Sequence, residues 1–124
     1  MIQMRVVQTA AEVNRFAESC HVTPEPGLCL YLAENRGETV GVCFYRFTDF
    51  GMRILAVDTG DDLPLFDGII RTTMAALFDR EDDRVEFAEQ VNREALVACR
   101  FVGEGEMAIP SANHFFETCK NCKN

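Results

Sequence analysis

The spacing of apolar and polar positions along the chain changes between the two-residue period of strands and the 3.6-residue period of helices. Apolar runs joined by short turns predict a meander of three strands over residues 28–34, 38–50 and 52–59. Between residues 62 and 80, apolar residues recur at i, i+3 and i+4, which predicts a long helix with one face toward the core. This apolar stripe consists of Phe66, Ile69, Ile70, Met74, Leu77 and Phe78.

Shorter elements flank this central part of the chain. Residues 3–8 predict a first strand, and Thr9 is placed to cap a helix over 10–20, with Glu12 completing a capping box. After the long helix, the pattern predicts a strand, a short helix, a brief strand and a final helix, over 83–89, 93–101, 106–109 and 112–119. We therefore expect one α/β (α+β) domain over residues 1–124, with a mixed, mostly antiparallel central sheet flanked by helices.

The overall charge restricts the classes of partner. Twelve basic and twenty acidic side chains give a net charge of −8, which argues against nucleic acid and against an anionic membrane surface as partners. No apolar run is long enough to span a bilayer, and the first ten residues lack the apolar region of a signal peptide. We expect a cytoplasmic protein.

The six cysteines fall into two groups. Four lie in apolar segments and are predicted to be buried thiols: Cys20, Cys29, Cys43 and Cys99. Cys119 and Cys122 form a CxxC pair in a polar tail, five residues after His114, and two thiols with an imidazole are ligands that zinc accepts. A lone CxxC lacks the second ligand pair of zinc signatures, so free terminal thiols are the favoured interpretation and a zinc site is the alternative.

The predicted order of elements resembles the GNAT superfamily of N-acetyltransferases, which have the acyl-CoA N-acyltransferase fold. Three segments carry the resemblance: ILAVDTG at 54–60, LFDGIIRTTMAAL at 65–77 and NREALVACRFVGEGEM at 92–107. The resemblance covers almost the whole chain, but the helix predicted at the C-terminal end stands where the family has its final strand. The chain therefore looks like a divergent, C-terminally trimmed GNAT domain.

The resemblance implies a site for acetyl-CoA on the strand that contains residues 54–60. In the family, the backbone of this strand pairs with the pantetheine arm of the cofactor. The matching positions here are Leu55, Ala56 and Val57.

The resemblance also implies a pyrophosphate site at the start of the following helix. The family pattern there is Arg or Gln, two residues, Gly, one residue, then Gly or Ala. Gly68 is the only match, because Leu65 and Ile70 occupy the other two positions. The implied cofactor-binding residues, placed in the first turn of the helix, are Asp67, Gly68, Ile69 and Ile70. The nearby Asp61 and Asp62, like Asp67, would repel the phosphates.

Candidate acid–base groups lie close to this implied site. The family's reaction needs a base to take a proton from the acceptor amine. Asp58 ends the strand over 52–59, and Glu86 alternates with apolar neighbours on the next strand, where it faces a cleft or solvent. The tyrosine that acts as general acid in the family has no counterpart, and Cys99 stands near its place, either as proton donor or as a core residue.

The resemblance thus implies an acetyl-CoA-dependent N-acetyltransferase of the GNAT type, and the departures from the family pattern imply that cofactor binding and catalysis are both degenerate. Its acceptor would be a primary amine of a small molecule or peptide, and the negative charge favours a cationic one. The alternative is a non-enzymatic GNAT-like module that binds a partner or a metal through the C-terminal helix and the CxxC tail. A third possibility is a self-associating structural protein, a homodimer, because the exposed edges of a shortened sheet commonly pair in dimers.

Overall fold

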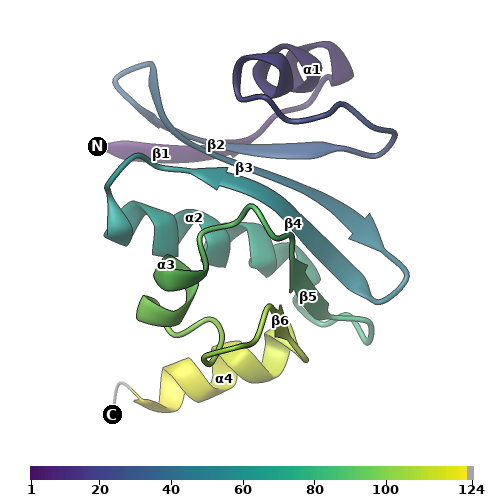
Figure 1. Cartoon of the computed structure of the whole chain (residues 1–124), viewed down its shortest axis with the longest axis vertical. Helices are drawn as coiled ribbons and strands as arrows, with labels where there is room; N and C mark the ends of the chain where they lie inside the picture. Colours follow the sequence, from purple (N-terminus) through teal and green to yellow (C-terminus); the bar gives the residue numbers. More distant parts are fainter. Residues whose placement is uncertain (123–124) are drawn as a thin grey trace.

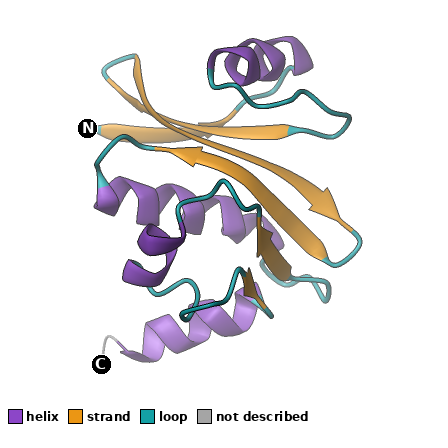
Figure 2. Cartoon of the chain, viewed as in Figure 1, coloured by secondary structure: helices purple, strands orange, loops and turns teal. Residues whose placement is uncertain are grey.

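The computed structural model describes residues 1–122, and the side chains of residues 1–118. They form one sheet, four helices and a short 3-10 turn (Figures 1 and 2). The strands are β1 (Ile2–Val6), β2 (Cys29–Asn35), β3 (Glu38–Thr48), β4 (Gly51–Asp58), β5 (Arg84–Phe87) and β6 (Ala108–Ile109). The helices are α1 (Ala10–Ser19), α2 (Leu63–Met74), α3 (Arg93–Ala98) and α4 (Ala112–Cys122), with the 3-10 turn η1 (Ala75–Leu77) directly after α2. None of these helices in the described part of the chain is long and apolar enough to cross a membrane.

The order of the strands in the sheet follows their order along the chain, from β1 to β6. All neighbouring strands are antiparallel except β4 and β5. That pair is parallel because α2 and η1 return the chain to the end of the sheet at which β4 began. The expected mixed, mostly antiparallel sheet flanked by helices is confirmed.

Helices cover both faces of the sheet. In Figure 1, α1 lies on one face, and α2, α3 and α4 lie on the other. Under α1, the side chains of Leu30, Leu32 and Phe44 are fully buried. On the opposite face, Ile69 and Ile70 of α2 are fully buried in the larger of the two hydrophobic clusters. Successive strand residues point to opposite faces, so one set of alternating positions serves each cluster.

The four cysteines whose side chains are described are free thiols. Cys43 is fully buried, and burial raises the pKa of its thiol to about 12. Cys20, Cys29 and Cys99 are half-buried, and burial is the main cause that raises the pKa of each. The prediction of a buried thiol is confirmed for Cys43, while the other three lie at the borders of the two clusters.

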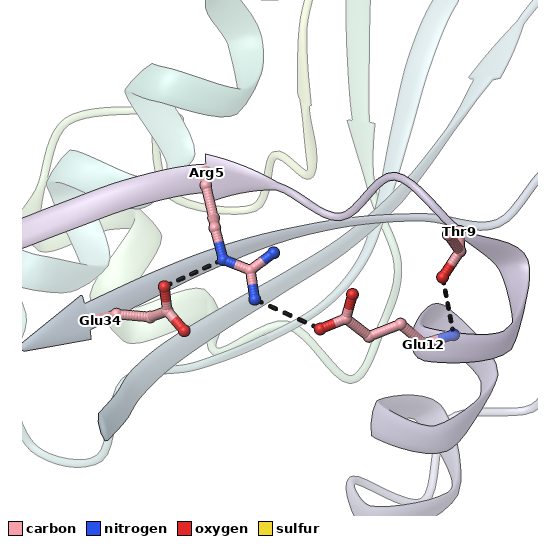
Figure 3. Close-up of polar contacts among 4 residues, drawn as sticks. All are labelled: Arg5, Thr9, Glu12 and Glu34. Atoms are coloured by element: carbon pink, nitrogen blue, oxygen red, sulfur yellow. Dashed lines mark hydrogen bonds and ion pairs between the residues drawn. The ribbon is translucent and has the colours of Figure 1, made fainter. Parts of the chain in front are cut away.

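The start of α1 follows the predicted capping pattern in one of its two parts. The hydroxyl of Thr9 accepts a hydrogen bond from the backbone N–H of Glu12 at 3.3 Å, which confirms the cap (Figure 3). The carboxylate of Glu12, predicted to complete a capping box, instead contacts Arg5 of β1 at 3.2 Å. Arg5 also binds Glu34 of β2 at 2.9 Å, so one guanidinium ties β1 to both β2 and α1.

The helix predicted over 62–80 is shorter in the structure. Asp62 caps it, and it ends at Met74, where η1 begins. Phe78, predicted to face the core, is 51% exposed because the chain leaves the helical path at η1. Its ring packs edge-on against Phe116 of α4, with 4.9 Å between the ring centroids.

Candidate functional site

The second half of β4 has an open edge on the side of β5. The two strands pair only from Gly51 to Ile54, and the last backbone bond between them runs from Ala88 N–H to the Ile54 carbonyl at 2.9 Å. The register between β3 and β4 shifts at this point, which leaves Leu55 as an extra residue in a bulge. From Ala56 to Asp58, β4 pairs with β3, and from Leu55 to Asp58 it has no strand on its other side.

Two cavities border this open segment. The larger, of about 540 Å³, lies toward α1 and is lined by Cys20, Glu25, Phe44 and residues 55–58. The smaller, of about 270 Å³, lies beside the start of α2 and is lined by residues 57–63 with Phe66, Asn92 and Ala95. Val57 and Asp58 line both cavities, so the two recesses lie on either side of the end of β4.

The loop from β4 to α2 is held by its own aspartates. The carboxylate of Asp58 accepts a hydrogen bond from Gly60 N–H at 3.0 Å. The carboxylate of Asp62 accepts one from Leu65 N–H at 2.9 Å, and the Asp62 carbonyl accepts one from Phe66 N–H at 3.0 Å. The N–H groups of Gly60, Leu65 and Phe66 are thus already occupied by acceptors from the loop itself.

This arrangement leaves little room for an anion at the start of α2. A phosphate binds a helix N-terminus through free backbone N–H groups. Pro64 has no N–H, and those of Leu65 and Phe66 are taken, so at most the N–H of Leu63 remains in the first turn. The acidic loop therefore caps α2 with a negative charge of its own, that of Asp62.

The four residues that the sequence assigned to the pyrophosphate lie deeper in α2 than predicted. Gly68 is the sixth residue of the helix, in its second turn and not its first, so the N–H groups of Asp67, Gly68, Ile69 and Ile70 donate to carbonyls one turn earlier. Ile69 and Ile70 are fully buried, and Asp67 forms an ion pair with Arg71 at 2.9 Å. The placement of Gly68 in the first turn is therefore wrong, and the assignment of residues 67–70 to the cofactor stays a prediction, at positions whose backbone N–H groups are used within the helix.

Gly68 itself has an unexpected environment. A methyl group added there would meet only the Cε of Met4, at 3.5 Å, which is an ordinary van der Waals contact. Close packing within the described chain therefore does not require glycine at this position.

The two predicted catalytic residues border neither cavity. Glu86 lies between Arg53 and Arg84, with oxygen–nitrogen distances of 3.3 and 3.2 Å. Cys99 ends α3, where burial raises the pKa of its thiol, nearby Asp67 raises it further and Arg71 lowers it. Their catalytic roles stay predictions, and the structure places both outside the two recesses at the end of β4.

The predicted zinc ligands are spread along α4, with His114 in its first turn and the two cysteines in its last turns. His114 is exposed, and the side chains of Cys119 and Cys122 lie outside the described residues. Among the side chains of residues 1–118, no group of three His, Cys, Asp or Glu is arranged to hold a metal ion. The hypothesis that involves the CxxC pair is therefore left as a prediction.

Sequence reasoning missed the residues that form the far wall of the larger cavity. Cys20, His21 and Glu25 reach β4 because the chain after α1 folds back along the sheet. In the sequence, prolines flank Glu25, and in the structure His21 has a left-handed backbone with a φ of +58°. The prolines indicate a loop, but the sequence does not reveal which strand this loop covers, because that depends on the pairing of the whole sheet.

Comparison with solved structures shows a GNAT-like fold. A ribosomal-protein-alanine N-acetyltransferase from Brucella melitensis biovar Abortus 2308 superposes with a TM-score of 0.63 and 9% sequence identity, covering 86% of this chain and 94% of that one. The match to the structure of YhhK, a putative N-acetyl transferase from E. coli, bound to coenzyme A covers 82% of this chain and 86% of that one, with 6% identity and a TM-score of 0.48. No family model and no curated protein matches the chain. The likeness establishes the fold alone.

Proposed function

We propose that this protein is an acyl-CoA-dependent N-acyltransferase of the GNAT type that holds its cofactor mainly by the pantetheine arm. The arm would lie against the open edge of β4 at Leu55, Ala56 and Val57, and the amine acceptor would enter the larger cavity. The observation that carries this proposal is the unpaired segment of β4 between two recesses. The comparison with N-acetyltransferases supports it at the level of the fold.

The open edge has the right chemistry for a pantetheine arm. An unpaired strand edge presents backbone N–H and C=O groups that add a further extended segment. The pantetheine arm is extended and contains two amide groups, so it can pair with such an edge much as a peptide would. Bound there, acetyl-CoA would supply its acyl group as an activated thioester.

The nucleotide end of the cofactor does not fit the loop equally well. The donors at the start of α2 are occupied by Asp62, and Asp58 and Asp61 add negative charge beside it. A pyrophosphate near these carboxylates would be repelled. We therefore assign most of the binding free energy to the pantetheine part and little to the nucleotide.

Asp58 is the residue to which we assign proton transfer. It is one of two residues that line both recesses, and the only one of the two with an ionisable side chain, so it is the group within reach of an acceptor in one recess and a thioester in the other. An alkyl amine arrives protonated and must lose a proton before its nitrogen attacks a carbonyl carbon. Asp58 would hold the ammonium group, accept that proton directly or through one water, and return a proton to the departing thiolate as the C–S bond breaks.

Chemical-shift mapping of backbone amides tests the binding mode. Acetyl-CoA added to the ¹⁵N-labelled protein should shift the amides of Leu55 to Asp58 and leave those of residues 67–70 almost unchanged. Shifts concentrated in α2, with none along β4, would contradict the proposal.

Loss of thioester absorbance in the presence of a panel of primary amines tests the assignment of Asp58. Asp58→Asn should lower the rate strongly while leaving the affinity for acetyl-CoA similar. Glu86→Gln, on the same sheet but outside both recesses, is the matched control and should retain the rate. Equal rates for both variants would rule out Asp58 as the proton carrier.

A further inference from the structure

The two edges of the sheet differ in how well they are protected. β6 has only two residues and is followed directly by Pro110, so it offers almost no edge to a further strand. β1 has five residues, Ile2 to Val6, with no proline, glycine or lysine and no bulge in its pairing to β2. An edge strand of this kind is one that natural monomers usually block.

The backbone groups that face outward from β1 can be identified from one hydrogen bond. The N–H of Val7, directly after β1, donates to the carbonyl of Leu30 in β2 at 2.9 Å. In an antiparallel ladder the backbone groups of alternate residues point to the same side. Gln3 and Arg5 therefore bond toward β2, and the N–H and C=O groups of Ile2, Met4 and Val6 point to the open edge.

The same three residues carry the apolar side chains of the strand. Ile2 is 43% exposed and Val6 is 37% exposed, while Met4 packs partly into the cluster under α2. On the opposite face, the one charged side chain of the strand, Arg5, is bound to Glu34 and Glu12 (Figure 3). No unneutralised charge of β1 itself opposes a neighbour at this edge.

We propose that a second copy of this chain adds to the sheet at β1, in an antiparallel pairing centred on Met4. This register places Ile2 of each copy opposite Val6 of the other, and Met4 opposite Met4. Each of these pairs exchanges two backbone hydrogen bonds, and all of the outward-facing groups of β1 are used. The apolar side chains of both strands then form one continuous band on the face covered by α2.

The symmetry of the strand is what selects a second copy over another partner. A two-fold axis through an antiparallel pair requires that residues equally distant from its centre be complementary. Around Met4, the residues two places away are both apolar and exposed, and those one place away are Gln3 and Arg5, which do not repel. The sheet would continue through both copies without any change in either chain.

Sedimentation of the protein, prepared without an N-terminal tag and measured over a wide concentration range, tests this inference. The wild-type chain should form a dimer. Met4→Pro removes an outward N–H without removing a bond to β2, so it should give a folded monomer. Ile2→Lys places a charge in the proposed band and should also give a monomer. Leu63→Lys is the matched control and should stay dimeric. Leu63 is equally exposed at 43%, but it lines the smaller cavity at the start of α2 and is not part of β1.

Three results would overturn the inference. One is a wild-type protein that is monomeric at every concentration. Another is a dimer that persists in Met4→Pro when circular dichroism shows the native fold. If Met4→Pro fails to fold, a dimer that persists in Ile2→Lys is the third, because that side chain is exposed and its replacement leaves the core intact.

Discussion

The carboxylate of Asp62 accepts a hydrogen bond from the backbone N–H of Leu65 at 2.9 Å, and so occupies the place that a phosphate oxygen takes at an open helix N-terminus. Strand, loop and helix have the architecture of a phosphate-binding site, but the loop supplies its own anion. The conflict between a suitable fold and an acidic loop is thereby resolved: the helix is capped internally.

This relationship predicts that charge and capping at position 62 can be separated. Asp62→Ser keeps a side-chain oxygen for Leu65 and removes the charge, so thermal stability should be nearly unchanged while affinity for acetyl-CoA rises several-fold. Asp62→Ala loses the cap and should lower the free energy of unfolding by about 1 kcal/mol. Urea denaturation and calorimetric titration measure the two effects. Equal stability of both variants would show that the observed bond does not cap α2.

The environment of Gly68 predicts that alanine is tolerated there. The added methyl group meets only Met4 at 3.5 Å, and alanine is the better helix former by about 1 kcal/mol. Gly68→Ala should therefore raise the free energy of unfolding and leave affinity for acetyl-CoA unchanged. A loss of affinity in a fully folded variant would mean that the cofactor approaches the second turn of α2 after all.

The left-handed backbone of Arg100, just after α3, predicts that glycine at this position stabilises the fold. Its φ is +64°, and the bonds from Arg100 N–H to Val97 and from Phe101 N–H to Leu96 form the turn that usually has glycine at this place. Arg100→Gly should raise the free energy of unfolding by about 1 kcal/mol, because the left-handed conformation is strained for arginine. His21→Gly, at φ +58° after α1, is a second test by the same urea titration. Destabilisation by both would indicate that the side chains matter more than the backbone strain.

The lowered pKa of Asp83 predicts that the free energy of unfolding depends on pH in the acidic range. Burial raises the pKa of its carboxyl group, but hydrogen bonds from Ser111 and Asn113 lower it by more, so the folded-state pKa lies below the ordinary value. A carboxyl group of this kind stabilises the fold above its unfolded pKa of about 3.9, and the contribution is lost as pH falls through the folded pKa.

Asp83→Asn tests this by denaturation at neutral and acidic pH. The difference in unfolding free energy from wild type should be largest at pH 7 and shrink in acid, where the wild-type group is protonated. Asp82→Asn, exposed beside it, is the matched control. A difference that does not change with pH would contradict the role given to the charge of Asp83.

Much of the fold follows from local signals in the sequence. The Thr9 cap, the meander from β2 to β4 and the apolar stripe of α2 rest on short-range patterns, and the structure has each of them. The end of α2 was wrong because the stripe continues to Phe78 in sequence, while η1 breaks the helical path. Periodicity does not reveal where a helix tightens.

The site was less predictable because it depends on pairing between distant segments. Leu55 lies in a bulge because the register between β3 and β4 shifts there, and Asp58 lies beyond the pairing of β4 with β5, which ends at Ile54. The family pattern placed Gly68 at the phosphate, but the position of the cap, Asp62, decides which residues are in the first turn. Glu86 alternates correctly along β5, yet its arginine neighbours come from the register with β4 and from the strand's own first residue.

The most direct test of the account is a calorimetric comparison of acetyl-CoA with acetyl-pantetheine, which lacks the nucleotide. If the edge of β4 supplies the binding and the loop does not hold the phosphates, the two affinities should agree within about threefold, a difference of less than about 1 kcal/mol. Acetyl-CoA binding about a hundredfold more tightly would show that the loop binds the nucleotide. Saturable binding of neither ligand would contradict the cofactor site on β4.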